Sequence, residues 1–337
     1  MEKNGKFFPP APSLELSLII TVYNEEKTME ELINRCDSVL SSKHGDYEII
    51  VVDDGSFDRT VEITRAKLVS ITGLRIVQLY RNVGQVAAIS AGLSVARGRW
   101  LMLMDGDLQH QPEDIPRFLS LRAEGYDLIA SYRRRREETL RRRLLTPIIN
   151  FANRAALGVQ IADFGSAFRL FRAEIANMMK DKQGYVHYNT PELFINARRY
   201  TEIPIEQVRR KAGSSKWTFL AFMLFNFDFL VTAMRPVLIA VWGSIIGVFI
   251  GMLLYILYLS GAISDVEALS GPVSIVLISI LIFMLAVVWR EIVRNRNLLM
   301  GVPPFLIENI YSRELEHSGP GSFLSICPTR KEDSAKE

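Results

Sequence analysis

Short apolar runs alternate with amphipathic stretches between Leu16 and about Ser131. The intervening stretches Glu25–Leu40, Asp58–Ile71 and Gln85–Ala96 have helical spacing. Five short runs rich in Ile, Val and Leu predict buried strands: Leu16–Val22, Tyr47–Val52, Arg75–Leu79, Trp100–Met104 and Leu128–Ser131. This alternation predicts an α/β, Rossmann-like fold, a mainly parallel sheet with helices on both faces. Ligands of such sheets bind at the carboxyl ends of the strands.

The second half of the chain predicts a membrane anchor. Val237–Ser260 is a run of 24 residues without a charge, and Val273–Trp289 is a second uncharged run. The second run alone is also compatible with a buried core helix, but its pairing with the first favours two spans. The connection Gly261–Pro272 has no Lys or Arg, whereas both outer flanks are basic. The positive-inside rule therefore predicts a transmembrane hairpin over 236–290, with the front domain and both termini in the cytosol.

Two further segments predict contact with the membrane surface. Arg133–Arg143 holds seven arginines and leads into an apolar stretch, so 133–157 is expected to be interfacial, although an arginine run is also typical of a solvated helix face. The segment 216–235 is aromatic and apolar and predicts an interfacial amphipathic helix. The expected organisation begins with an N-terminal extension at 1–15 and a cytosolic domain at 16–215 that includes the segment 133–157. The interfacial helix at 216–235 and the hairpin at 236–290 follow, and a cytosolic segment with a disordered tail covers 291–337.

Composition agrees with this division. The mean hydropathy is +0.14 although 23% of the residues are charged, so apolar residues must be concentrated in part of the chain. A net charge of +3 is too small to indicate a nucleic-acid partner. The two cysteines, Cys36 and Cys327, lie far apart and indicate a reducing compartment without a disulfide framework.

Acidic residues follow three of the predicted strands. They are Glu25 after the first strand, Asp53 and Asp54 after the second, and Asp105 with Asp107 after the fourth. One acidic strand end is commonly a turn or a helix cap, but three at one edge of a parallel sheet are expected to converge. Asp105 and Asp107, separated by a glycine, would bind one Mg²⁺ or Mn²⁺ that bridges a diphosphate.

The motif order V-Y-N-E, D-D-G-S, R-N-x-G and D-G-D-L-Q, from Ser17 to Gln111, resembles the family 2 inverting glycosyltransferases with the GT-A fold. Thr21 departs from the proline of many members, and no G-x-G-x-x-G follows the first strand, which disfavours a dinucleotide-binding oxidoreductase. The resemblance implies a nucleotide-sugar site, with Asp53 and Glu25 on base and ribose and Arg81 on phosphate. The full set of donor-site candidates is Thr21, Tyr23, Glu25, Asp53, Asp54, Arg81, Gly84, Asp105 and Gln109.

The remainder of the chain resembles the polyprenyl-phosphate glycosyltransferases. Asp163–Arg169 is similar to their D-x-G-x-x-x-R segment and Arg210–Trp217 to their R-x-x-G-x-S-K segment, and the two-helix anchor matches the bacterial members. This implies a UDP-sugar in preference to a GDP-sugar, undecaprenyl phosphate as acceptor, and the bacterial inner membrane. A two-helix anchor also makes a homo-oligomer possible.

A lipid phosphate is mostly a dianion at pH 7 and needs cations more than a general base. The candidates for binding it are Arg133, Arg136, Arg169, Arg210, Ser215 and Lys216. The candidate catalytic residues are Asp105, Asp107, Asp163 and Arg169, and Asp163 would act as a base or orient the acceptor or an arginine. Two alternatives stay open: a transferase for a saccharide or diacylglycerol hydroxyl, and a non-catalytic scaffold of the same fold.

Overall fold

The computed structural model describes residues 14–42, 46–134, 157–208 and 305–313, together with 150–151, 153–155 and separate residues between 246 and 292. The chain divides into two compact units. One comprises Met1–Arg143, Ile161–Ser215 and Gly301–Glu337, and the other comprises Leu144–Gln160 and Lys216–Met300.

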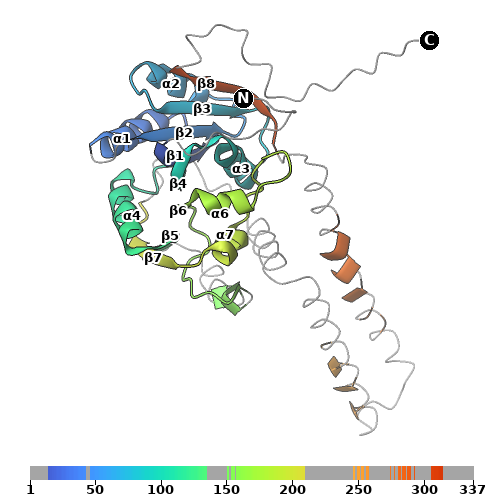
Figure 1. Ribbon diagram of the computed structural model, residues 1–337. Helices are drawn as coiled ribbons and strands as arrows, with labels where there is room; N and C mark the ends of the chain where they lie inside the picture. The colour runs from blue at the N-terminus through green and yellow to red at the C-terminus, as the bar shows by residue number, and fades with distance from the viewer. Residues whose placement is uncertain are drawn as a thin grey trace, which may run out of the picture. The chain divides into compact units, whose positions relative to one another are not determined.

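The first unit is built on an eight-stranded sheet with the strand order β7-β5-β6-β4-β1-β2-β3-β8 (Figure 1). Its strands are β1 (Leu14–Val22), β2 (Tyr47–Asp53), β3 (Leu74–Leu79), β4 (Gly98–Asp105), β5 (Leu128–Arg133), β6 (Arg169–Arg172), β7 (Tyr200–Ile205) and β8 (Ile307–Ser312). The centre of the sheet is parallel, because β1 pairs in parallel with both β2 and β4. β6 and β8 run antiparallel to their neighbours β4 and β3. The mainly parallel α/β sheet predicted from the sequence is confirmed.

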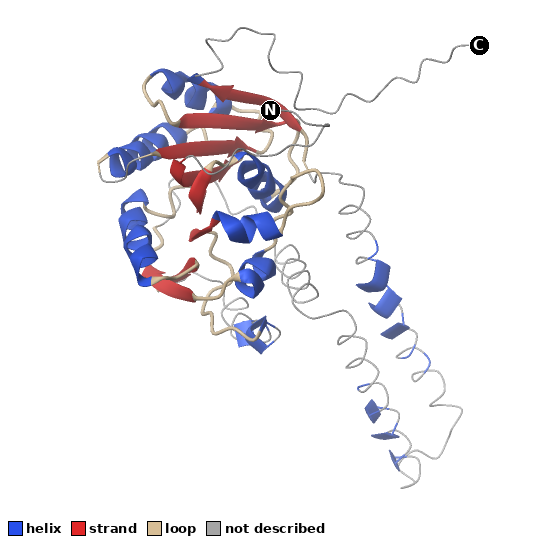
Figure 2. Cartoon of the chain, in the orientation of Figure 1, coloured by secondary structure: helices blue, strands red, loops and turns tan. Residues whose placement is uncertain are grey.

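Helices lie on both faces of the sheet, as the cartoon in Figure 2 shows. They are α1 (Met29–Ser41), α2 (Thr60–Ala66), α3 (Gln85–Val95), α4 (Ile115–Leu121), α6 (Ala173–Met178) and α7 (Thr190–Asn196), with the short 3-10 turns Lys67–Val69, Pro112–Asp114 and Arg122–Glu124. α1 and α4 pack on the face that carries Leu18 and Ile20. α3 packs on the opposite face, where a Cβ on Gly92 would lie 2.5 Å from Ile19 Cγ2. Glycine at this position lets α3 lie very close to the sheet.

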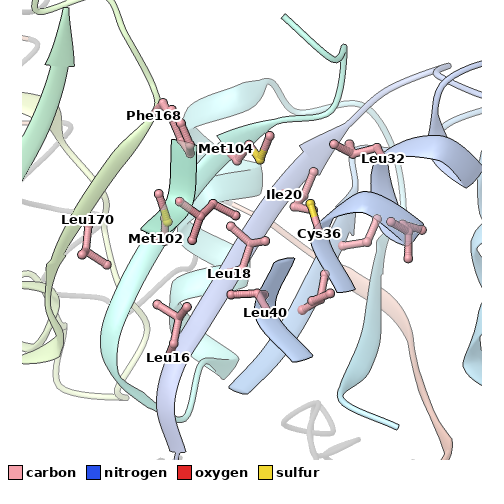
Figure 3. Packing of buried hydrophobic residues seen from close by; sticks show 14 of the residues in the cluster. Leu16, Leu18, Ile20, Leu32, Cys36, Leu40, Met102, Met104, Phe168 and Leu170 are labelled. Atoms are coloured by element: carbon pink, nitrogen blue, oxygen red, sulfur yellow. The ribbon is translucent and has the colours of Figure 1, made fainter. Parts of the chain in front are cut away.

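The core on the α1 face follows from the alternation of side chains along β1. Leu16, Leu18 and Ile20 point toward the Leu32, Cys36 and Leu40 side of α1 (Figure 3). All six side chains are at most 1% exposed. Each buried aliphatic side chain contributes roughly 1.5–3 kcal/mol to stability. All five predicted strands are present in the structure, as β1 to β5.

Three strands lie outside the elements predicted from the sequence. β6 and β7 extend the sheet beyond β4, and β8 adds an edge strand next to β3. β8 falls within 291–337, which we expected to lie apart from the front domain. The first helix also begins at Met29 and not at Glu25, because the backbone N–H of Thr28 donates to Glu25 O (3.0 Å) in a preceding turn.

Most of the expected membrane elements lie outside the described residues. These include 135–149 of the basic segment, all of 216–235, and much of the two spans at 237–260 and 273–289. The residues of these spans that are described are helical, and Phe249, Leu281 and Trp289 are more than half exposed. Among the residues that the structure describes, none of the helices has the length and apolar character needed to cross a bilayer.

A buried carboxylate joins three strands at the amino edge of the sheet, opposite the acidic clusters. Glu48 is fully buried and accepts hydrogen bonds from Ser17 Oγ (2.6 Å), Arg75 Nη1 (2.9 Å), and the backbone N (2.7 Å) and Nε (3.2 Å) of Arg97. Removal of one member of a buried ionic group is destabilising, because the remaining buried charges lose the partner that offset the free-energy cost of removing them from water.

We expect Glu48→Ala to lower the free energy of unfolding by about 3 kcal/mol, because two arginines and a buried hydroxyl lose their acceptor. Thermal unfolding of the full chain measures the effect. Glu62→Ala is the matched control, because Glu62 pairs with Arg59 in an exposed ion pair, and its melting temperature should equal that of the unmodified protein. Equal melting temperatures for the two variants would contradict the stabilising role of Glu48.

Candidate active site at the carboxyl edge of the sheet

The three acidic clusters lie at one level of the sheet. Thr21 is opposite Asp105 in the β1–β4 register, and Val22 is opposite Asp53 in the β1–β2 register. The backbone N of Gly106 donates to Thr21 O (3.1 Å). The convergence expected from the strand order is therefore present in the fold.

Side chains fix the first two loops to one another. Asn24, in the left-handed region with a φ of 54°, donates its backbone N–H to Ser56 Oγ (2.8 Å) and accepts from Phe57 N through Oδ1 (3.0 Å). The backbone N of Glu25 donates to Thr60 Oγ1 (2.9 Å). The Tyr23 ring packs edge-on against Phe57. Tyr23 and Glu25 are thus held against the loop that follows β2.

Asp53 combines burial with an unpaired acceptor. Its side chain is 1% exposed, and Oδ2 accepts a hydrogen bond from the backbone N of Ser56 (3.1 Å). Oδ1 has no hydrogen-bond partner within the described part of the chain. Burial raises the pKa of this carboxyl group. A buried acceptor of this kind is suited to a donor group on a ligand.

Asp54 holds the third loop. Its Oδ1 accepts from the backbone N of Val83 (2.8 Å) and its Oδ2 from the backbone N of Gly84 (2.9 Å). Gly84 has a φ of 96°, which an L side chain rarely adopts, and it caps the start of α3. Arg81 lies on the same loop with its side chain exposed. The contacts of Asp54 therefore position Arg81 and α3.

Asp105 and Asp107 lie at and just beyond the end of β4. Asp105 Oδ1 accepts from Gln85 Nε2 (2.6 Å), and Asp107 Oδ1 accepts from the backbone N of Gln109 (3.1 Å). In the described ranges no group of three or more His, Cys, Asp or Glu side chains could by itself hold a metal ion. Carboxylate oxygens are the ligands that Mg²⁺ and Mn²⁺ prefer, so the chemistry of these two side chains is compatible with a divalent cation that takes its other ligands from a diphosphate and water.

His110 lies directly behind this pair. Its ring stacks on Phe168 with centroids 5.1 Å apart, and Nδ1 lies 3.8 Å from Asp105 Oδ2. The side chain is 3% exposed, and burial lowers the pKa of His110 to about 4. The imidazole is therefore neutral at physiological pH.

Because His110 protonates less readily when folded than when unfolded, it stabilises the fold above about pH 6.5 and ceases to do so as the pH falls toward 4. Lowering the pH from 7.5 to 5.5 should therefore reduce the free energy of unfolding of the chelator-treated protein by about 1 kcal/mol. Chemical unfolding at both pH values measures it, with His110→Gln as the variant that should lose this part of the dependence. Identical pH dependence in both proteins would contradict a depressed pKa.

A second ionic group lies around Asp163. This residue is 2% exposed and accepts two hydrogen bonds from Arg133, through Nε (2.7 Å) and Nη2 (3.0 Å). The carboxylate of Glu202 accepts from the backbone N of Ala162 (2.7 Å) and of Asp163 (3.3 Å), and burial raises the pKa of Glu202. The pair of Arg133 and Asp163 is thus held by β5 on one side and by β7 on the other.

Arg169, a candidate for binding the acceptor phosphate, is buried in this structure, and its role toward a phosphate stays a prediction. It is 1% exposed, Nη2 donates to Phe164 O (2.5 Å), and Nη1 lies 3.3 Å from Tyr188 Oη and from Thr190 Oγ1. These contacts close the segment between Asp163 and Arg169 against the start of α7. The sequence motif shows that an arginine is present but does not indicate which groups accept its hydrogen bonds.

Gln109 connects the Asp105–Asp107 loop to the residues that follow β7. Its Oε1 accepts from Gln207 Nε2 (2.5 Å), and its backbone O accepts from Val208 N (3.2 Å). A cleft of about 460 Å³ opens nearby, lined in part by Gln111, Arg134 and Val208. Four sequence candidates lie outside the described residues: Arg136, Arg210, Ser215 and Lys216.

The candidate site also contains three polar residues that were not predicted from the sequence: Gln85, Glu202 and Gln207. Gln85 was visible only as the first residue of a predicted helix after Gly84. Each residue contacts a partner 20 or more positions away in the sequence, so no local periodicity indicates the contact.

A mainly parallel α/β sheet with three acidic loops at its carboxyl edge is compatible with a nucleotide-binding enzyme. Comparison with known proteins identifies the family. The chain belongs to glycosyl transferase family 2, whose model matches residues 17–178. The chain is 34% identical over 245 residues to the undecaprenyl-phosphate 4-deoxy-4-formamido-L-arabinose transferase of Salmonella choleraesuis (strain SC-B67), covering 72% of this chain and 75% of that protein. The same values apply to the transferase of Salmonella paratyphi B.

Solved structures found to be similar to this chain include glucosyl-3-phosphoglycerate synthase from Mycobacterium tuberculosis in complex with Mn²⁺, uridine-diphosphate-glucose and phosphoglyceric acid. The identity is 20% and the TM-score 0.48, with 66% of this chain and 79% of that chain covered. S. aureus TarS 1-349 is 18% identical with a TM-score of 0.40, covering 56% of this chain and 58% of that chain.

Proposed function

We propose that this glycosyltransferase moves a sugar from a nucleotide-sugar, with UDP-sugars favoured, to the phosphate of a polyprenyl phosphate such as undecaprenyl phosphate. The observation that carries the proposal is the 34% identity that extends over 75% of a relative named for this acceptor. The match continues well beyond the residues of the family model, into the part of the chain that would meet the acceptor.

The donor would bind at the carboxyl edge of the sheet. The unpaired Oδ1 of Asp53 is suited to accept a hydrogen bond from the base, and the exposed Arg81 is suited to the diphosphate. Asp105 and Asp107 would hold Mg²⁺ or Mn²⁺. The bound cation would neutralise charge on the diphosphate leaving group. Thr21, Tyr23, Glu25 and Gln109 would line the same site.

The reaction would be a single in-line displacement. A phosphate oxygen of the lipid attacks the anomeric carbon, and the bond from that carbon to the donor diphosphate breaks. The nucleoside diphosphate leaves with the bonding electron pair, and the configuration inverts. Because the attacking phosphate is already a dianion near pH 7, no side chain has to remove a proton.

The acceptor phosphate would be held by cations. Arg133 is suited to this role, because two hydrogen bonds to Asp163 fix its guanidinium while its side chain remains 22% exposed. Arg136, Arg210, Ser215 and Lys216 would complete the phosphate site. Arg169 would act through the Asp163 segment, since it is 1% exposed and is held by Phe164 O.

A transmembrane hairpin at 236–290 would place this reaction at the membrane surface, with the catalytic unit and both termini in the cytosol of a bacterium. The uncharged runs, their basic flanks and the exposed apolar side chains of Phe249, Leu281 and Trp289 support this arrangement. The segments 133–157 and 216–235 would lie in the interface, and the hairpins of two copies could associate.

Membranes containing the full chain, supplied with undecaprenyl phosphate and labelled nucleotide-sugars, test the proposal. The donors should include UDP-4-deoxy-4-formamido-L-arabinose, other UDP-sugars and GDP-sugars. We expect a lipid-linked labelled sugar from at least one UDP-sugar, and its loss in the presence of a chelator. UDP binding without transfer from any donor would instead favour a non-catalytic scaffold.

A further inference from the structure

The side chain of Gln85 touches the carboxylate proposed to bind metal. Gln85 Nε2 donates to Asp105 Oδ1 at 2.6 Å, across the two loops that follow β3 and β4. Gln85 is the first residue of α3. The contact therefore joins the start of α3 to the end of β4.

The structure holds Gln85 in place from the loop before it. Asp54 accepts hydrogen bonds from the backbone N of Val83 and of Gly84, at 2.8 and 2.9 Å, and is itself 5% exposed. The backbone N of Ala88 donates to Gly84 O (3.0 Å), which closes the first turn of α3. The backbone position of Gln85 is thereby set by the loop after β2.

The body of α3 is equally constrained. Every residue from Ala87 to Val95 is buried. A Cβ on Gly92 would lie 2.5 Å from Ile19 Cγ2 and 2.9 Å from Val52 Cγ2, so the helix has no space in which to shift toward the sheet. A side chain at the first position of such a helix is a fixed point from which to orient Asp105.

An amide is chemically suited to this task. It donates a hydrogen bond without adding charge, so the carboxylate keeps its negative charge for a divalent cation. A lysine or arginine in the same place would form an ion pair that competes with the metal. An ionised carboxylate has about four acceptor positions, so one hydrogen bond on Oδ1 is compatible with metal binding.

We infer that Gln85 is a positioning residue that fixes the carboxylate of Asp105 for metal binding in the nucleotide complex. The inference rests on the proposed function, because it assumes that Asp105 binds the metal. Gln85 would thus belong to the donor site and would act on the metal through Asp105.

The test is to measure the binding of Mn²⁺ to the detergent-purified full chain at saturating UDP. Electron paramagnetic resonance reports the concentration of free Mn²⁺. Gln85→Met keeps the length of the side chain and removes the donor, and Gln85→Asn keeps the amide but shortens its reach. Val86→Ala is the control, because Val86 lies in the same helical turn with its side chain 47% exposed.

Both Gln85 variants should bind Mn²⁺ about tenfold more weakly, a change of about 1.4 kcal/mol, while Val86→Ala binds as the unmodified protein does. The Mn²⁺ concentration for half-maximal transfer should rise by the same factor, with kcat at saturating metal within about threefold. UDP binding in the presence of chelator should stay unchanged.

Unchanged Mn²⁺ affinity in Gln85→Met, or in Gln85→Asn if the first variant does not fold, would overturn the inference. Unfolding of both variants would also overturn it, because Gln85 would then be a requirement of the fold. Failure of the unmodified protein to bind Mn²⁺ with UDP or to transfer a sugar would refute the proposed function itself. That outcome is distinguishable from failure of the inference, because it is observed without any substitution at Gln85.

Discussion

Asp107→Asn should lower the rate of sugar transfer by at least about a thousandfold, equivalent to about 4 kcal/mol of transition-state stabilisation. Asp107 is 9% exposed beside the end of β4, and with Asp105 it forms the only acidic pair that the sequence resemblance assigns to the metal. Asparagine keeps the size of the side chain and its acceptor for the backbone N of Gln109. It removes the negative charge that a divalent cation requires.

Steady-state transfer assays over a range of Mn²⁺ concentrations measure this effect, together with UDP binding with and without metal. UDP should bind to Asp107→Asn with the same affinity in chelator, and the additional affinity conferred by Mn²⁺ should disappear. Glu15→Gln is the matched control, because Glu15 pairs with Arg122 near the start of β1, at the other end of the strand from the acidic clusters. Transfer by Asp107→Asn at a rate close to that of the control would show that the carboxylate is not required.

The second large effect is expected at the ion pair between Arg133 and Asp163. Arg133→Gln and Asp163→Asn should each lower kcat/KM for polyprenyl phosphate by about a hundredfold, or about 2.7 kcal/mol. The loss should appear mainly in the KM for the lipid, because the proposed role of Asp163 is to orient the arginine that meets the phosphate. The double variant should be no more than about twofold worse than the poorer single variant, since the two side chains act as one unit.

A double-mutant cycle distinguishes this role from the alternative in which Asp163 is a general base. In that case Asp163→Asn would lower kcat in a pH-dependent manner, and the effects of the two substitutions would multiply. Arg122→Gln serves as the control, because Arg122 forms an ion pair with Glu15 on the surface of the same unit. Multiplicative losses in kcat would contradict the positioning role of Asp163.

The fold was predictable where hydrophobic pattern alone decides it. The runs around Ile19, Ile50 and Leu103 are apolar on both faces, which is typical of central parallel strands. β7 and β8 lack this pattern, because edge strands are only partly buried and tolerate residues such as Pro204 and Glu308. β6, Arg169–Arg172, is short and ends in arginines, so its pairing with β4 depends on tertiary contacts.

The candidate site was predictable to a similar extent. Asp53, Asp105 and Asp107 follow apolar strands, and strand order alone places them at one edge. Arg169 was predicted as a candidate for binding the acceptor phosphate, but its contacts with Phe164, Tyr188 and Thr190 could not be predicted from the sequence, because they depend on how distant segments pack together. The position of Gln85 beside Asp105 likewise depends on how α3 packs against the sheet.

The most direct test of the account is to compare undecaprenyl phosphate with undecaprenol as acceptors for the same purified chain and the same UDP-sugar. Mass spectrometry and ³¹P nuclear magnetic resonance of the lipid product identify the new bond. We expect a glycosyl phosphodiester from undecaprenyl phosphate and no product from undecaprenol. A glycoside formed on undecaprenol or on another hydroxyl acceptor, with no phosphodiester, would contradict the proposed acceptor.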